Sequence, residues 1–269
     1  MKLHLPVAAV IALSYAVSSS YCDENKHHAA EVPLEGYELF WSDEFDGEKL
    51  DTAKWDYRNL GPRREAVNVK DTVSVDGKGH LVLTTKRVND TIHTAMLGTH
   101  GKFETKFGYF ECRVKMQKSH GHWSAFWLQS PTLGNKIGDP ATSGTEIDIY
   151  ECFAAQKDWV AHNIHWDGYG KHHKHAGSGP VDVPDLCEGY HTFGLKWTPD
   201  EYRFYVDGKL TWQTRQAVSH TAEYIILSLE VGALQKSIID KQDGFSDSAL
   251  FDYVRVYKKR LENGPGATS

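Results

Sequence analysis

The chain has 269 residues and a mass of 30.4 kDa; 40% of its residues are hydrophobic and 25% are charged. This balance excludes a mostly disordered or fibrous chain, and a domain of this length can bury a large core. The formal net charge is −6, so there is no basic excess of the kind that nucleic-acid or anionic-membrane binding requires. The informative excess is aromatic, with 8 Trp, 13 Tyr and 11 Phe.

Residues 1–20 have the features of a secretory signal peptide. Lys2 supplies the positive start, residues 5–17 form an apolar stretch, and three small serines follow. The stretch is too short for a spanning helix, and no later run reaches about 18 apolar residues. We therefore expect a secreted or periplasmic protein without a membrane span. Cys22 lies where a lipoprotein cysteine could lie, but the bulky Tyr21 before it disfavours a lipid anchor.

Short strand patterns separated by turn residues recur over residues 31–260, which we interpret as a single domain followed by a loose tail at 261–269. Examples are 72–75, 80–86, 202–206 and 251–257, and an Asp-Gly pair at 207–208 is typical of a β-hairpin. No segment of helical length keeps a 3.6-residue period. The chain is therefore predicted to be all-β, and its size favours a sandwich of two sheets.

An aromatic strand is predicted at 121–128. Alternation places Trp123, Ala125 and Trp127 on one face and Ser124, Phe126 and Leu128 on the other. Two indoles separated by a small alanine could form a platform for a sugar ring, although buried tryptophans are commonly core residues. We expect Trp123 to face a substrate and Trp127 to be partly structural.

The most unusual segment is an acidic strand at 144–151, because carboxylates are depleted in strands. Glu146 and Asp148 share one face by alternation, whereas Glu151 would fall on the buried face, where an unpaired carboxylate is costly. A β-bulge near Ile149 or Tyr150 would add one residue and turn Glu151 onto the face of the other two. We therefore predict a bulge and three converging carboxylates.

Such a cluster can divide acid and base roles between its members. Like charges at short range do not all ionise easily, so one carboxyl keeps its proton while another stays anionic. Retaining glycoside hydrolysis needs this combination, with the two carboxyls about 5–5.5 Å apart. A solvated sheet face or a calcium site is the alternative interpretation of the same acidic residues.

Histidines after the acidic strand are the third candidate element. In the segment 162–166, Asn163 and His165 share a face, from which His165 could bind a carboxylate or a sugar hydroxyl. The run 171–175 contains three histidines and two lysines among glycines. We interpret it as a loop at the rim of a cleft in preference to a metal-binding tract.

Four cysteines remain after residue 20: Cys22, Cys112, Cys152 and Cys187. An exported protein can form disulfides, and four cysteines allow three full pairings. Cys112 lies in a strand pattern that makes it a core thiol, and Cys152 with Cys187 is the preferred pair. The spacings fit no zinc motif.

The acidic segment resembles the signature of glycoside hydrolase family 16, in the form that contains the bulge. The resemblance extends over most of the chain beyond residue 40 and includes five motifs in the family's order. These are the opening at 41–45 with 50–55, and the segments 107–115, 123–128, 146–151 and 252–257.

The resemblance implies a concanavalin-like β-jelly roll and endo-acting, retaining hydrolysis of a β-linked polysaccharide. By motif position Glu146 would be the nucleophile, Glu151 the general acid/base and Asp148 the residue that tunes them, with Trp123 stacking on a sugar. No cofactor is required. Many members hold a structural Ca²⁺, which here would use Glu44 and Asp252.

Departures from the common laminarinase pattern leave the substrate open. Tyr150 stands where that pattern carries methionine, and 152–153 and 224–232 also differ. The candidates are a β-1,3- or mixed-linkage glucan, an algal galactan (agarose, porphyran or carrageenan) and a host galactose-containing glycan. A non-catalytic carbohydrate-binding protein and a transglycosylase are alternatives on the same fold, and we expect a monomer.

Overall fold

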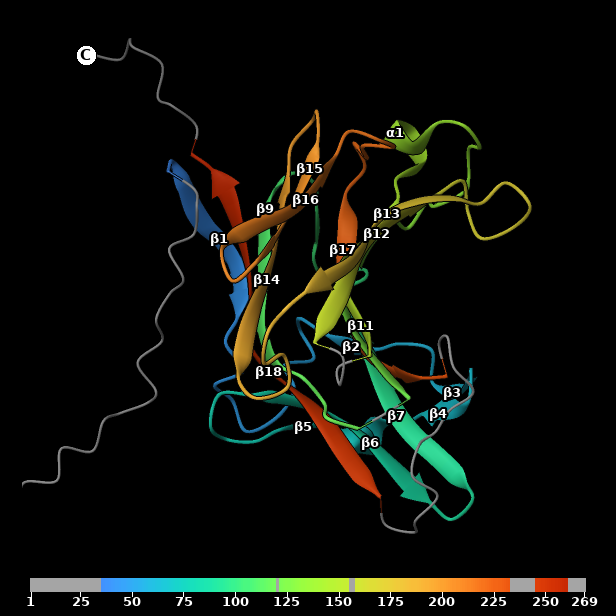
Figure 1. Ribbon diagram of the computed structural model, residues 1–269, viewed down its shortest axis with the longest axis vertical. Coiled ribbons are helices and arrows are strands. Elements are labelled where there is room, and N and C mark those ends of the chain that lie inside the picture. The colour runs from blue at the N-terminus through green and yellow to red at the C-terminus, as the bar shows by residue number, and fades with distance from the viewer. Residues whose placement is uncertain (1–34, 120, 155–157, 233–244, 261–269) are drawn as a thin grey trace, which may run out of the picture.

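The computed structural model describes residues 35–119, 121–154, 158–232 and 245–260 (Figure 1). The described residues form strands that pair almost entirely antiparallel; their two short helices are α1 (Pro140–Ser143) and the 3₁₀ helix η1 (Lys70–Thr72). The predicted all-β jelly roll of two sheets is confirmed. No helix among these residues is long and apolar enough to cross a membrane.

One sheet is built around the long strand β18, which pairs with β9, β6 and β1 along different parts of its length. The strands β14, β15 and β16 follow beyond β9, and β5 lies beyond β6. The bounds are β1 (Tyr37–Asp43), β3 (Gly61–Arg63), β4 (Ala66–Asn68), β5 (Val73–Val75), β6 (Leu81–Val88), β9 (Gly108–Lys115), β14 (Tyr190–Trp197), β15 (Tyr202–Val206), β16 (Lys209–Thr214) and β18 (Ser246–Lys259).

The second sheet runs in the order β13, β12, β11, β10, β17, and β17 then pairs with β7 and β8. The strand β7 joins both sheets, because it pairs with β6 near its start and with β17 near its end. The bounds are β2 (Asp56–Tyr57), β7 (Thr91–Gly98), β8 (Glu104–Thr105), β10 (His122–Gln129), β11 (Glu146–Ala154), β12 (Trp159–Trp166), β13 (Lys174–Asp182) and β17 (Glu223–Val231).

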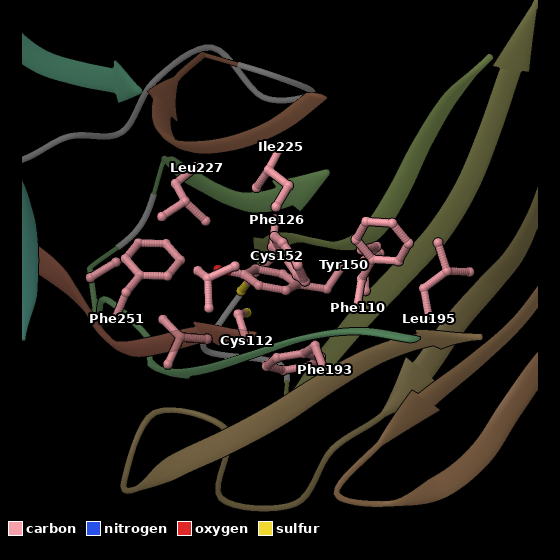
Figure 2. Close-up of a cluster of buried hydrophobic side chains, with 14 of the residues drawn as sticks. Phe110, Cys112, Phe126, Tyr150, Cys152, Phe193, Leu195, Ile225, Leu227 and Phe251 are labelled. Carbon is pink, nitrogen blue, oxygen red and sulfur yellow. The ribbon is translucent and has the colours of Figure 1, made fainter. Parts of the chain in front are cut away.

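The core lies between the two sheets, and Figure 2 shows side chains from both sheets meeting there. Phe110 on β9 and Phe193 on β14 come from the first sheet, and Phe126 on β10 and Tyr150 on β11 come from the second. All four are completely buried. The apolar positions of alternating strands thus point inward, which leaves the opposite face of β10 and β11 for polar chemistry.

The predicted strands occur where alternation placed them, with shifted ends. The segment at 72–75 begins one residue later, because Thr72 closes η1, and the segment at 251–257 is part of the longer β18. The hairpin between β15 and β16 turns at Asp207 and Gly208, whose φ angles are 47° and 73°. A two-residue hairpin with positive φ at both turn positions favours an Asp-Gly pair.

The preferred disulfide is not formed. Cys112, Cys152 and Cys187 are buried thiols in the structure, so the pairing of Cys152 with Cys187 is wrong for this fold. Gln117 lies between the two: its Nε2 is 3.9 Å from Cys152 Sγ, and its carbonyl accepts from Cys187 Sγ at 3.4 Å. Each thiol is packed as a small apolar side chain. Cys22, the predicted signal peptide and the tail at 261–269 lie outside the described residues.

The two acids predicted to bind calcium are each bound by an arginine. Arg255 donates to both carboxylate oxygens of Glu44, at 3.0 and 2.7 Å. Arg113 donates to Asp252 at 2.5 Å. Calcium needs several oxygens directed at one point, and carboxylates occupied by guanidinium groups do not offer that arrangement. Each carboxylate is paired with an arginine in the structure, and calcium binding there stays a prediction.

Candidate active site

A β-bulge on β11 determines which side chains face the groove. Phe126 on β10 is opposite Tyr150, but the next residue, Trp127, is opposite Asp148, so Ile149 is the extra residue. Ile149 and Tyr150 are both completely buried in the core. Glu151 is thereby returned to the same face as Asp148, as the sequence predicted.

The polar backbone at the bulge has a dedicated side-chain partner. A bulge interrupts the ladder and leaves backbone groups to be satisfied by other means. The Nδ1–H of His162 on β12 donates to the carbonyl of Ile149 at 2.6 Å, and its Nε2 accepts from the hydroxyl of Thr211 at 2.8 Å. Burial lowers the pKa of His162 to about 4, so the imidazole is neutral. His162 is therefore a structural residue that holds the bulge.

The start of β11 is fixed by a buried carboxyl on β17. Glu223 accepts hydrogen bonds from the backbone N–H and the hydroxyl of Thr145, at 2.9 and 3.2 Å. Burial raises the pKa of Glu223 to about 8. Gly144, the residue before Thr145, has φ of 73°, and a Cβ there would lie 2.2 Å from Cβ of Ser130. Only glycine fits at that position, and it sets where the acidic strand begins.

The acidic face lines a groove with a volume of about 680 Å³. All seven residues predicted to act in catalysis or substrate binding contribute to its wall. They are Glu146, Asp148 and Glu151 on β11, Trp123 and Trp127 on β10, and Asn163 and His165 on β12.

Glu146 is held by two neutral donors. The hydroxyl of Tyr169 and the side-chain Nε2 of Gln129 both donate to Glu146 Oε2, the latter at 3.0 Å. Both donors favour the ionised form of the carboxyl. Tyr169 and Gln129 are also hydrogen-bonded to each other. One oxygen of Glu146 is thus fixed between two partners, which orients the carboxylate in the groove.

Asp148 lies between the two glutamates and close to a histidine. His165 Nε2 is 3.3 Å from Asp148 Oδ2, an oxygen that makes no hydrogen bond in the structure. Ligand atoms of Glu146, Asp148 and His165 all lie within 4.8 Å of one another. These three residues are the set among the described residues that could hold a metal ion, although the same spacing suits a proton-sharing network.

Glu151 is held by an amide from the neighbouring strand. The side-chain Nδ2 of Asn163 on β12 donates to Glu151 Oε2. Asn163 is paired with Gly177 on β13, and a Cβ at that glycine would lie 2.1 Å from Asn163 Oδ1. The missing side chain at Gly177 therefore makes room for the asparagine that positions Glu151.

The three carboxyls differ in how strongly they retain a proton. Burial raises the pKa of Glu146, but hydrogen bonds from Tyr169 and Gln129 and the nearby His165 oppose the shift. Burial and the charge of Glu146 hold the pKa of Asp148 well above its usual range. Burial and the charge of Asp148 do the same for Glu151. Hydrogen bonds that favour the anion suit Glu146 to the ionised form, and the raised pKa of Glu151 favours its protonated form.

This arrangement matches a known family over most of its length. The model of the glycosyl hydrolases family 16 matches residues 62–254. This chain belongs to that family. The match spans β4 to β17 and includes the bulged acidic strand.

Relatives within family 16 differ in the polysaccharides that their names record. The chain is 28% identical to glucan endo-1,3-beta-glucosidase A1 of Niallia circulans over 84% of this chain and 39% of that protein. It is 27% identical to keratan-sulfate endo-1,4-beta-galactosidase of Sphingobacterium multivorum over 91% of this chain and 61% of that protein. The chain thus spans less than two thirds of either relative.

A solved structure gives the same fold. The laminarinase catalytic domain of Thermotoga maritima superposes with a TM-score of 0.69 at 28% identity, over 84% of this chain and all of that domain. Family 16 membership and the jelly-roll architecture therefore agree with the sheet order described above.

The two tryptophans of β10 occupy different environments in this family 16 chain. One face of Trp123 is covered by the guanidinium of Arg64, 4.5 Å from the ring centroid, and Phe153 packs against the ring at 5.0 Å. Trp127 is 8% exposed, and its indole N–H donates to the hydroxyl of Ser228 at 3.2 Å. The contact between Trp123 and a charged guanidinium group was not predicted from the sequence.

Several groove residues were not among the sequence predictions. Tyr169, which contacts Glu146, follows β12 in a turn, and no motif marks it. His173 stacks on His165, with ring nitrogens 2.9 Å apart, and it lines the groove together with His175. The run 171–175 therefore lies at the rim as predicted, but its last two residues begin β13, so it is not entirely a loop. The remaining new lining residues are Arg58, Asn59, Arg63, Arg64, Gln129, Phe153, Ser228 and Glu230.

Proposed function

We propose that this protein is an exported endo-acting β-glycosidase that cleaves a β-linked polysaccharide with retention of configuration. Glu146 is the nucleophile, Glu151 is the general acid/base, and Asp148 adjusts the protonation of both. The observation that supports the assignment is the bulge at Ile149, which brings all three carboxyls into one groove. Export is proposed from residues 1–20 alone.

The mechanism follows from the environments of the two glutamates. In the first step the carboxylate of Glu146 attacks the anomeric carbon, and the proton of Glu151 passes to the departing glycosidic oxygen. In the second step Glu151, now anionic, removes a proton from a water molecule whose oxygen attacks the anomeric carbon, and the bond to Glu146 breaks to release the free carboxylate. Asn163 stabilises that anion through its hydrogen bond to Glu151. His165 faces Asp148 and the developing charge in the centre of the groove.

Substitution of each glutamate tests these roles. We expect Glu146→Gln to lower kcat by roughly 10³-fold or more without weakening binding, because the amide cannot attack carbon. Glu151→Gln should lower kcat by roughly 10²–10⁴-fold, most of all on substrates with poor leaving groups. Glu188→Gln, an exposed acid that pairs with Lys118, is the matched control and should retain full activity. Wild-type turnover by Glu146→Gln would refute the assignment.

Stereochemistry and substrate require separate measurements. Proton NMR of the first product formed should show the β-anomer, and an initial α-anomer would exclude the two-step mechanism. A screen of laminarin, mixed-linkage glucan, agarose, porphyran and carrageenan, with product sizes measured over time, should identify the polymer. Products of intermediate length at early times are expected from an endo-acting enzyme. Binding without products from any polymer would indicate a carbohydrate-binding protein instead.

A further inference from the structure

Two adjacent arginines on the β3–β4 hairpin form part of the groove wall. Arg63 and Arg64 lie at its turn, and both line the groove. The Nε–H groups of both donate to the same carboxylate, that of Glu230 on β17. Glu230 is 5% exposed, whereas the arginine side chains are 31% and 38% exposed. A buried acid thus fixes two partly exposed guanidinium groups at the groove.

The charges on this wall do not cancel. Both guanidinium groups are permanently charged, so the carboxylate of Glu230 alone leaves an excess of one positive charge on the groove wall; Glu65, the other acid of the hairpin, does not line the groove. A single arginine is enough to pair with a buried acid, as Arg113 does with Asp252 elsewhere in the molecule. The second arginine is therefore not explained by the neutralisation of Glu230.

A third arginine extends the positive wall toward the catalytic acids. Arg58 lines the groove, and its Nη2 donates to Gln129 at 2.6 Å. Its guanidinium also lies over the ring of Tyr224, 5.2 Å from the centroid. Gln129 in turn donates to Glu146. The positive charge therefore extends from the hairpin to the hydrogen-bond partners of the proposed nucleophile.

The hairpin holds its arginines in a defined orientation. Arg64 has φ of 52°, a conformation that residues other than glycine adopt infrequently. Its guanidinium stacks on the indole of Trp123 while its Nε–H is used by Glu230. Within the described part of the chain the Nη groups of Arg63 and Arg64 make no hydrogen bond or ion pair, so this edge of each guanidinium can bind a ligand in the groove.

We propose that Arg63 and Arg64 form a subsite for an acidic substituent on the polysaccharide. This inference rests on the proposed function and specifies the substrate class. The substituent is an oxyanion carried by a sugar ring, either a sulfate ester or the carboxylate of an acidic sugar. A guanidinium donates two parallel hydrogen bonds to a pair of oxygens, a geometry that both groups present. Glu230 is the positioning residue of this subsite.

The test compares polymers that differ in charge alone. A sulfated galactan is paired with its desulfated product, and a uronic-acid-containing β-glycan with its carboxyl-reduced product. We expect the wild-type enzyme to have a KM at least about tenfold lower on the charged member of one pair. This preference should weaken as the salt concentration rises, because salt screens exposed charges. The pair that shows the preference identifies the substituent.

Substitution of the arginines locates the subsite. Arg63→Gln and Arg64→Gln should each raise KM on the charged polymer by about tenfold and leave kcat within about twofold. On the neutral polymer the change in KM should be clearly smaller than on the charged polymer, because only the charged polymer carries the group that the arginines bind. Arg215→Gln, which removes a charge from a side chain that is 79% exposed and lies outside the groove, is the control. Glu230→Gln keeps both positive charges but no longer fixes the two guanidinium groups in place. This variant should therefore also lose part of the preference for the charged polymer.

Binding measured without turnover separates this inference from the proposed function. Titration of Glu146→Gln with oligosaccharides from each pair should show tighter binding of the charged member, and the added Arg64→Gln change should remove the difference. Hydrolysis with equal KM on both members would refute the acidic subsite and leave the glycosidase intact. Charge-dependent binding without hydrolysis by the wild type would refute the glycosidase and leave the subsite intact. An equal loss on charged and neutral polymers in the arginine variants would also refute the subsite.

Discussion

At the scale of single residues, the two glutamates of the groove have the same side chain but different hydrogen-bond partners. Glu146 receives two donors, from Tyr169 and Gln129, whereas Glu151 receives one, from Asn163. The pKa of Glu151 is held well above its usual range by burial, and Asn163 opposes that shift. Burial and the charge of Asp148 thus make the proposed acid hold its proton, and the asparagine makes that proton easier to release.

Removal of this donor should change the pH dependence of catalysis. Asn163→Ala removes the hydrogen bond, and Gly177→Ala should displace the amide, because a Cβ there would lie 2.1 Å from Asn163 Oδ1. In both variants the pKa of Glu151 rises further, so the basic limb of the kcat/KM profile moves to higher pH. Deglycosylation should slow, because the anionic form of Glu151 becomes harder to reach. Initial rates measured over the pH range give both quantities.

A glycine elsewhere serves as the control for this change. A Cβ at Gly189 would have no neighbour within 4 Å, so Gly189→Ala should leave the pH profile unchanged. A basic limb that moves to lower pH in Asn163→Ala, or that does not move, would contradict the role given to the asparagine.

At the scale of elements, the bulge on β11 depends on β12 beside it. His162 satisfies the carbonyl of Ile149, and the partner at its other nitrogen, Thr211, lies on β16 of the opposite sheet. One imidazole thus ties the bulge to a strand across the core. The strand β11 is therefore held at its bulge by a side chain from β12, which is itself bonded to β16 of the opposite sheet.

Loss of this imidazole should destabilise the fold and misplace Glu151. His162→Leu leaves the Ile149 carbonyl without its donor, which should lower the free energy of unfolding by about 1–3 kcal/mol. Because Glu151 lies two residues beyond Ile149, kcat should fall as well. His162→Gln, which retains a donor, should recover part of both. Denaturant unfolding and turnover at pH 7 measure the two effects, and a fully active, fully stable His162→Leu would refute the dependence.

The same histidine has a predictable effect on acid stability. Its pKa is about 4 in the folded protein and about 6.5 when exposed. Between pH 6.5 and 4 His162 is protonated in the unfolded chain but not in the folded protein, and this proton uptake favours unfolding. The stability that His162 contributes is therefore present above pH 6.5 and is lost as the pH falls toward 4. The difference in unfolding free energy between the wild type and His162→Gln should narrow over that interval.

Alternation and turn chemistry were enough to predict most of the elements. The pattern of Trp123 to Leu128 and the Asp-Gly turn after β15 are local signals, and the structure follows both. The bulge was predictable because strict alternation would have placed Glu151 on the apolar core face, where an unpaired carboxylate is costly. The positions of Tyr169 and Glu230 were not predictable, because they depend on how distant strands pair. The positive wall of the groove depends on the same long-range pairing.

At the scale of the whole molecule, the core packs without the disulfide between Cys152 and Cys187 that we predicted from the sequence. Cys112 and Cys152 are completely buried, and Cys187 is 9% exposed. Burial holds the pKa of Cys112 well above its usual range and raises the pKa of Cys187 to about 11. Thiolate is the reactive form of cysteine, so all three thiols should be inert in the folded state.

Thermal unfolding with and without a reducing agent tests this arrangement. With Cys22→Ser as background, dithiothreitol should leave Tm unchanged, because no disulfide joins the three described thiols. A thiol reagent should modify the three only after denaturant unfolds the chain. A disulfide between Cys152 and Cys187 would contribute roughly 2–5 kcal/mol. A Tm that falls by several degrees on reduction would therefore contradict the structure.

The bulge on β11 has a consequence for how the gene can vary. The extra residue and the kink compensate each other, because Glu146 and Glu151 lie five positions apart and strict alternation needs an even number of positions. In-frame loss of the codon for Ile149 would leave Glu146, Asp148 and the second glutamate on alternate positions of an unkinked strand. Loss of Ile149 would therefore keep all three acids on one face of the strand. Loss of Ile147, by contrast, would turn Asp148 to the face opposite Glu146.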